Sequence, residues 1–189
     1  MKKFWIDLET TGLNPSKHSI VQLAGIIEID NKVVDSFTLK TRPLKGTAVS
    51  NKALEVIGTS VKELKTYPDP EQVKMQLLDK FNHYVDPYDK KDKFLFLGYN
   101  AKFDYDFFRA WFEKQNFPYF GSFFWFPPID IMNLVAYISM EERSNLINFK
   151  LFQVCKYFGI DVNEEELHDA LYDIELTKKL YERVTAKID

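Results

Sequence analysis

Two carboxylates inside an apolar strand set the strongest limit on the fold of this chain. In FWIDLETTGL, residues 4–13, an apolar run of strand type is interrupted by Asp7 and Glu9. Side chains at i and i+2 of a strand project to one face, so these acids point together while Ile6 and Leu8 face the other way. Like charges so placed repel each other, and the strand end must be either solvated or neutralised.

Neutralisation by a divalent cation is the alternative that carries chemistry. Hard cations such as Mg²⁺ prefer carboxylate oxygens and turn the repulsion between two acids into attraction. Asp7 and Glu9 alone do not distinguish a metal site from a solvated strand end. A metal site requires further ligands elsewhere in the chain.

The segment GYNAKFDYDFF, residues 98–108, supplies one candidate ligand. Asn100 stands where it can cap a helix, and Asp104 falls in the first turns of that helix. Asp104 shares a face with the apolar Phe108, whereas Asp106 points about 200° away from Asp104 at 3.6 residues per turn. Asp104 is therefore the better candidate of the two acids.

The segment LHDALYD, residues 167–173, supplies two more candidates. Asp169 is a plausible N-cap, which leaves His168 in the preceding loop and Asp173 in the first turn, where the helix dipole favours an ionised carboxylate. Taken singly, Asp104 and Asp173 read as solvated helix acids and His168 as a loop residue. Their combination with the two strand acids is what points to a shared site.

Composition favours one soluble domain over residues 1–189. The chain has 189 residues, 46% of them apolar, and no low-complexity stretch divides it. It lacks a signal-peptide pattern and an apolar window of membrane length, so we expect a cytoplasmic protein with no membrane partner. The only cysteine, Cys155, lies in an apolar pattern and is expected to be a buried thiol.

The charge balance limits how the chain can hold nucleic acid. With 25 basic and 28 acidic residues, the formal net charge is −3, which argues against binding mainly through a basic face. A nucleic-acid enzyme remains compatible, because acids gathered at one site and neutralised by metal ions leave the working surface less negative.

The order of the predicted elements indicates an α/β fold. Three strands come first, at residues 2–9, 19–30 and 32–41, and Asp30-Asn31 is a tight-turn signal that makes them an antiparallel meander. Helices and short strands then alternate, which implies a mixed sheet, with an antiparallel meander plus parallel strands, flanked by helices. The predicted helices are 51–58, 70–85, 101–115, 130–140, 146–158 and 169–187, and the later strands are 93–99 and a short one near 124–129.

Three motifs in this order resemble those of the DnaQ-like 3′→5′ exonucleases, in the DEDDh group. The motifs are DLET at residues 7–10, NAKFD at 100–104 and HDALYD at 168–173. TTGL after the first acids, IGTSVKEL at 57–64 and Ile129-Asp130 add to the resemblance, which covers nearly the whole chain. It implies a ribonuclease H-like fold and the release of nucleoside 5′-monophosphates from 3′ ends.

The resemblance also implies the cofactors and the role of each site residue. Two divalent cations, Mg²⁺ or Mn²⁺, would be held with Asp7 as the bridging ligand, Glu9 and Asp173 completing the first site, and Asp104 holding the second. His168 would be the general base that activates the attacking water. The implied substrate contacts are Leu8, Thr10, Thr11, Gly12, Asn100 and Phe103.

Departures from the family pattern leave the substrate open. The family often has His where this chain has Tyr99, and Ile57 replaces the His of the family's HGIT region. The opening WIDLE also resembles oligoribonucleases, which carry Met at the position of Thr10. Single-stranded DNA or frayed DNA 3′ ends are favoured, with an exoribonuclease or oligoribonuclease as the alternative. A catalytically silent nucleic-acid-binding or polymerase-associated module is the alternative of another class.

The segment NFPYFGSFFWFPP, residues 116–128, has seven aromatic residues among thirteen. Core packing is the ordinary reading, a stacking platform for unpaired bases is the functional one, and a homodimer contact is a third. We expect Phe123 and Trp125 to pack in the core and Tyr119, with its polar tip, to contact a base. His18 and His83 receive no role from the sequence.

Overall fold

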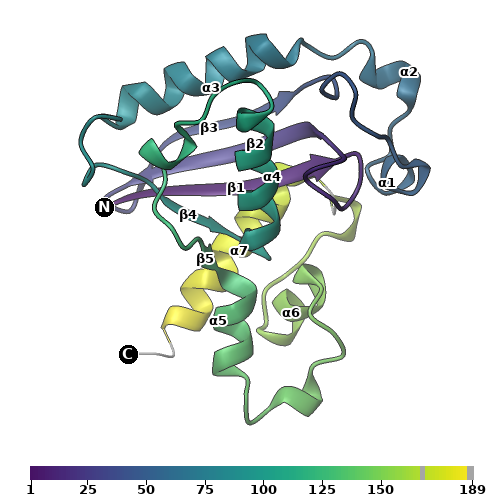
Figure 1. Cartoon of the computed structure of the whole chain (residues 1–189). Helices are drawn as coiled ribbons and strands as arrows, with labels where there is room; N and C mark the ends of the chain where they lie inside the picture. Colours follow the sequence, from purple (N-terminus) through teal and green to yellow (C-terminus); the bar gives the residue numbers. More distant parts are fainter. Residues whose placement is uncertain (167–168, 187–189) are drawn as a thin grey trace.

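A five-stranded mixed sheet forms the centre of the molecule (Figure 1). The computed structural model describes residues 1–166 and 169–186, so His168 lies outside the described residues. The strands are β1 (Lys2–Thr10), β2 (Ile20–Ile29), β3 (Lys32–Lys40), β4 (Leu95–Gly98) and β5 (Ile129–Asp130), in the order β3-β2-β1-β4-β5. The first three strands are antiparallel, whereas β4 runs parallel to β1 and β5 runs parallel to β4, which confirms the predicted fold class.

The predicted tight turn joins β2 to β3. Asp30 and Asn31 both adopt positive φ, 49° and 64°, which is the backbone that a two-residue hairpin with right-handed strand twist requires. Asparagine and aspartate tolerate this conformation better than most residues, so the meander follows from local sequence.

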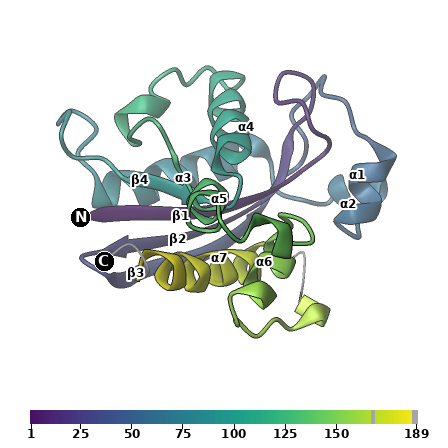
Figure 2. The ribbon, with the colours of Figure 1, turned by 90° about the horizontal axis from the view of Figure 1, so that it is seen from below.

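Helices cover both faces of the sheet. They are α1 (Asn51–Val56), α2 (Val61–Leu64), α3 (Pro70–Tyr84), α4 (Ala101–Glu113), α5 (Ile131–Ile138), α6 (Leu151–Tyr157) and α7 (Ala170–Thr185). Figures 1 and 2 together show α3 and α4 on one face of the sheet, α7 on the opposite face, and α1 and α2 beyond the carboxyl end of β1. In the described part of the chain, no helix combines the length and the apolar character needed to cross a membrane.

Alternation along β1 divides the interior into two cores. Phe4, Ile6 and Leu8 join the aromatic core under α3 and α4, while Trp5 joins the core under α5, α6 and α7. Asp7 and Glu9 continue the Trp5 side of the strand, as the period of two predicts. The second core also contains the fully buried Cys155, as expected from the sequence.

The helix predicted for residues 146–158 begins later than expected. In the structure α6 starts at Leu151, and the preceding segment is irregular apart from a 3₁₀ turn at Arg143–Asn145. The Tyr99 hydroxyl donates to the Phe149 carbonyl at 2.8 Å, and the backbone N–H of Lys150 donates to the Asn148 side chain at 2.9 Å. These bonds engage the backbone outside a helical ladder, which explains the shorter helix.

The aromatic segment divides between core and surface. Phe120, Phe123 and Phe124 are buried, which confirms the expectation for Phe123. The expectation for Trp125 is wrong, because its side chain is 39% exposed and the Lys93 Nζ lies 5.3 Å from its ring centroid. Phe124 forms an isolated parallel bridge with Phe94, whose backbone bonds to Phe123 and Trp125 fix the chain at the point where it leaves the core.

Candidate active site

Acidic side chains gather around the carboxyl end of β1. Burial raises the pKa of Asp7 well above its ordinary value, and the negative charges of Glu9, Asp173 and Asp169 raise it further. Burial also raises the pKa of Glu9 to about 7, with added repulsion from Asp173 and Asp169. Asp173 lies in the first turn of α7, so this helix brings a second element to the acids of the strand.

Asp104 approaches the same acids from the other face of the sheet. It lies in the first turn of α4 and is 4% exposed. Burial raises its pKa well above the usual range, the charge of Asp7 adds to this, and hydrogen bonds from the backbone of Asp104 and Leu8 act in the opposite direction. Asp106 instead forms an ion pair with Lys102 at the surface, so the predicted orientation of the two acids is observed.

Two further acids hold the helices that carry the site. The Asp169 Oδ1 accepts hydrogen bonds from the backbone of Leu171 and Tyr172, both at 3.0 Å, and is the N-cap of α7, as predicted. The Asp130 Oδ1 accepts from the backbone of Asn100 and Met132, again both at 3.0 Å. These bonds fix where α7 and α4 begin, and with them the positions of their first-turn acids.

Asn100 differs from its expected role as a helix cap. It occupies the N-cap position of α4 in the left-handed conformation, with φ 61° and ψ 41°, and its side chain makes no capping hydrogen bond. Its backbone N–H is the group that matters, because the bond to Asp130 ties the start of α4 to the end of β5.

The donor set of this cluster suits divalent cations. Asp7, Glu9 and Asp104 form no ion pair with any lysine or arginine of residues 1–166 and 169–186. Buried carboxylates without a compensating charge are costly, and oxygen ligands are those that Mg²⁺ and Mn²⁺ prefer. Within the same residues, no group of three or more His, Cys, Asp or Glu side chains is already arranged to hold a metal ion.

A cavity of about 490 Å³ adjoins the acids through Glu9. This volume lies within the range of about 300–1,000 Å³ typical of small-molecule sites. Its walls are mainly apolar, with a few polar groups. The lining residues are Leu8, Glu9, Thr10, Gly12, Leu13, His18, Ser50, Lys52, Ala53, Val56, Ile57 and Phe103.

The expected substrate contacts fall into two groups. Four of them line the cavity, namely Leu8, Thr10, Gly12 and Phe103. Thr11 is fully buried, and its hydroxyl donates to the Ala48 carbonyl at 2.8 Å. Tyr119 is 66% exposed and follows the carboxyl end of α4, at the opposite end of that helix from Asp104.

Sequence reasoning missed one residue of the cavity wall, His18. The residues near His18 in the chain have no ligand spacing, and nothing in the sequence places it beside Glu9. The loop of residues 11–19 folds back so that the backbone N–H of Thr11 donates to the Ser19 carbonyl at 2.8 Å. That closure brings His18 to the cavity.

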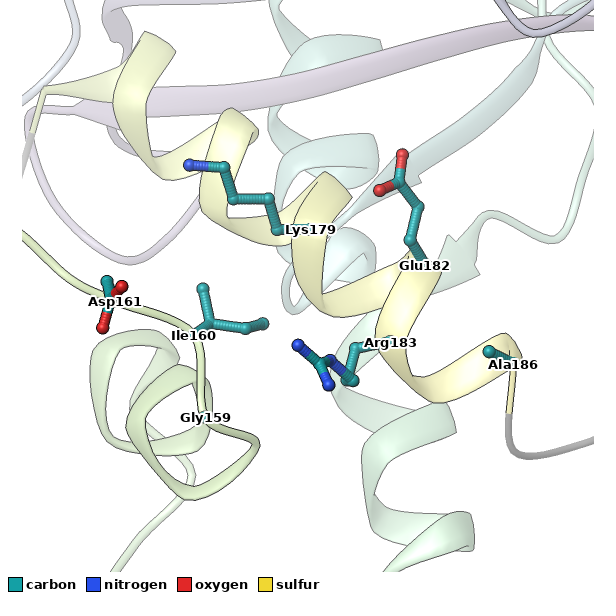
Figure 3. Close-up of a pocket in the computed structure, with 7 residues that line it drawn as sticks. All are labelled: Gly159, Ile160, Asp161, Lys179, Glu182, Arg183 and Ala186. Carbon is teal, nitrogen blue, oxygen red and sulfur yellow. The ribbon is translucent and has the colours of Figure 1, made fainter.

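A separate hollow of about 600 Å³ lies at the far end of α7 from Asp173 (Figure 3). Figure 3 shows Lys179 and Arg183 projecting from the last turns of α7 on the side of the segment 159–161, while Glu182 points away from that segment. Its lining mixes two basic residues with Glu182 and Asp161. It shares no residue with the acidic cluster and is not part of the candidate site.

Comparisons with known proteins agree with the motifs. The exonuclease family model RNase T matches residues 4–181. The chain is similar to DNA polymerase III PolC-type of Halalkalibacterium halodurans, with 28% identity over 178 residues, which are 94% of this chain and 11% of that protein. PolC-type DNA polymerase III of Thermotoga petrophila is 25% identical over 178 residues, with the same shares. The chain thus spans about a tenth of the curated relatives it matches.

Solved structures share the fold. E. coli exonuclease I in its zinc-bound complex with single-stranded DNA has a TM-score of 0.77 and 20% identity, over 98% of this chain and 40% of that one. Its complex with a dT13 oligonucleotide has a TM-score of 0.74 and 18% identity, over 98% and 41%. With a family match over nearly the whole sequence, this sheet and its acidic cluster belong to a member of the DnaQ-like exonuclease family, a nuclease with a ribonuclease H-like fold.

Proposed function

We propose that this chain is a 3′→5′ exonuclease that releases nucleoside 5′-monophosphates from single-stranded DNA or frayed DNA 3′ ends. One observation carries the proposal. The acids of β1, α4 and α7 meet beside a cavity of about 490 Å³, and Glu9 belongs to both the cluster and the cavity wall. A terminal nucleotide in the cavity would present its phosphodiester to the acids.

Exonucleases of this family use divalent metal ions, and the four acids are suited to hold two of them. Asp7 would contact both ions, Glu9 and Asp173 would complete the first site, and Asp104 would hold the second. When bound, such ions supply charge for the scissile phosphate and the leaving oxygen and lower the pKa of water. The raised pKa values of Asp7, Glu9 and Asp104 indicate carboxylates that need such a positive charge to stay ionised near neutral pH.

His168 is the proposed general base. It lies outside the described residues, but it directly precedes Asp169, whose charge acts on both Asp7 and Glu9. An imidazole with a pKa near 6.5 takes up a proton efficiently close to neutral pH.

DNA is the substrate that the relatives favour. The PolC-type relatives are DNA polymerases by name, and the exonuclease I structures hold single-stranded DNA. An unpaired strand enters a closed pocket without the cost of opening a duplex. Tyr119, which is 66% exposed and follows α4 in the chain, would contact a base upstream of the terminal nucleotide.

Digestion of 5′-labelled strands with Mg²⁺ tests the proposal. A ladder of shortened products, release of nucleoside 5′-monophosphates and an intact circular single strand are expected, with slower digestion of blunt duplex DNA and of RNA. No ladder would favour the silent binding module, RNA cut faster than DNA would favour an exoribonuclease, and internal cuts in the circle would contradict an end-binding site.

Matched variants test the residue roles. Asp7→Ala and Asp104→Ala are expected to abolish activity, while Asp106→Ala, two residues along the same helix, keeps it. His168→Ala should lower the rate by about 10²- to 10⁴-fold and leave Mn²⁺ affinity unchanged, because it removes a proton acceptor and no ligand. If Asp106→Ala were inactive and Asp104→Ala active, Asp106 and not Asp104 would be the acid of α4 that belongs to the site.

A further inference from the structure

His18 is held rigidly in the wall of the cavity that Glu9 shares. Its backbone N–H donates to the Asn14 carbonyl at 2.8 Å, which closes a turn within the loop. The Lys114 Nζ, at the end of α4, donates to the carbonyls of Pro15 at 2.6 Å and of His18 at 3.1 Å. These bonds fasten the loop to α4, so the imidazole projects from a backbone that is held in place.

The contacts of the ring determine which nitrogen carries hydrogen. The Nδ1 of His18 lies 3.1 Å from the backbone nitrogen of Asn14, whose N–H group can only donate, so Nδ1 accepts and Nε2 carries the hydrogen of the neutral ring. Nδ1 also lies 3.2 Å from the Asn14 carbonyl oxygen, and the shorter contact with the Asn14 N–H group favours the tautomer with hydrogen on Nε2.

The Nε2 edge of the ring covers Gly12. A Cβ atom added at Gly12 would lie 2.4 Å from both Nε2 and Cδ2 of His18, a distance that no real side chain tolerates. Gly12 and His18 both line the cavity, so the absence of a side chain at Gly12 leaves the space that this edge fills. The imidazole therefore stands in the cavity wall with its donor edge over the motif that follows Glu9.

The hydroxyl groups of the two threonines that follow Glu9 are already engaged. The Thr10 hydroxyl donates to the Gly12 carbonyl and the Thr11 hydroxyl donates to the Ala48 carbonyl, both at 2.8 Å. Among the residues that the structure describes, no partner accepts from His18 Nε2. The apolar residues Leu8 and Phe103 offer contact surface but no hydrogen bond.

We infer that His18 is a substrate-binding residue whose Nε2–H group donates to an oxygen of the 3′-terminal nucleotide in this cavity. The inference rests on the proposed function, because it takes the cavity as the site of that nucleotide. One donor fixed by its loop orients the nucleotide without taking part in proton transfer. Its loss should weaken substrate binding and leave the chemical step unchanged.

Three substitutions separate this role from a structural one. His18→Gln keeps a donor near the position of Nε2. His18→Asn keeps an acceptor near the position of Nδ1 for the Asn14 N–H group. His18→Phe keeps a ring over Gly12 but has neither the donor nor the acceptor. We would measure kcat and KM on a single-stranded oligodeoxynucleotide, together with the Kd of dTMP by titration calorimetry.

A ligand-binding role predicts a specific order of variants. His18→Asn and His18→Phe should raise KM and the Kd of dTMP by about two- to tenfold, the range for one hydrogen bond, with kcat unchanged, and His18→Gln should stay near wild type. The inference is overturned if His18→Asn matches wild type, if His18→Gln binds as weakly as His18→Phe, or if wild type does not bind dTMP. Wild type that binds dTMP without degrading strands would refute the proposed function alone.

Discussion

Asp7→Asn should make the metal-free protein more stable while abolishing its activity. In the structure Asp7 is half-buried near Glu9, Asp173 and Asp169, and loss of solvent contact together with these like charges raises its pKa well above the ordinary value. A raised carboxyl pKa means that the native state disfavours the charged form. The resulting penalty is present at a pH above the native pKa and fades as the pH falls toward the unfolded value.

The size of the effect follows from the geometry of β1. Asp7 and Glu9 are two residues apart on one strand, about 6.6 Å at 3.3 Å per residue. At an effective dielectric constant of about 20, two unit charges at this distance repel by about 2.5 kcal/mol. Removing one charge should raise the unfolding free energy at pH 8 by about 1–3 kcal/mol, or the Tm by about 2–12 °C for a chain of this length.

Thermal unfolding followed by circular dichroism in EDTA, at pH 8 and at pH 5, measures this gain. At pH 5 the gain should shrink, because the pKa of Glu9, about 7, leaves that residue protonated. Asp106→Asn is the matched control, since it removes an acid from a surface pair with Lys102 that is worth at most about 1 kcal/mol. An Asp7→Asn protein no more stable than wild type at pH 8, or an equal gain at pH 5, would refute the reasoning.

Three further outcomes are expected. Metal-free wild type should gain stability as the pH falls from 8 to 5, because Glu9 binds a proton near pH 7 in the native state and only near pH 4.5 in the unfolded state. Denaturant titrations over this pH range measure the gain, and an unfolding free energy that does not change with pH would contradict it. Tyr99→Phe leaves the Phe149 carbonyl without its donor and should cost about 1–3 kcal/mol in chemical denaturation, whereas no loss would mean that the bond contributes nothing net. Phe123→Ala should cost about 3–5 kcal/mol, and Trp125→Ala less than half of that, since only Phe123 is buried; equal losses in thermal melts would remove the distinction.

Local sequence predicts a large part of the site because local geometry is periodic. The period of two along β1 places Asp7 and Glu9 on one face, and the period of 3.6 along α4 separates Asp104 from Asp106. The N-cap preference for aspartate locates the start of α7 at Asp169. None of these features needs a distant residue, so each can be read from a few neighbouring positions.

Only the tertiary structure decides which distant groups meet and how deeply they are buried. The pKa of Glu9 depends on the charges of Asp173 and Asp169, which are more than 150 residues away in the chain and arrive with α7. The exposure of Trp125 and the place of His18 in the cavity wall likewise depend on how the chain folds back. Burial and long-range charge are properties of the packed molecule, and no local period encodes them.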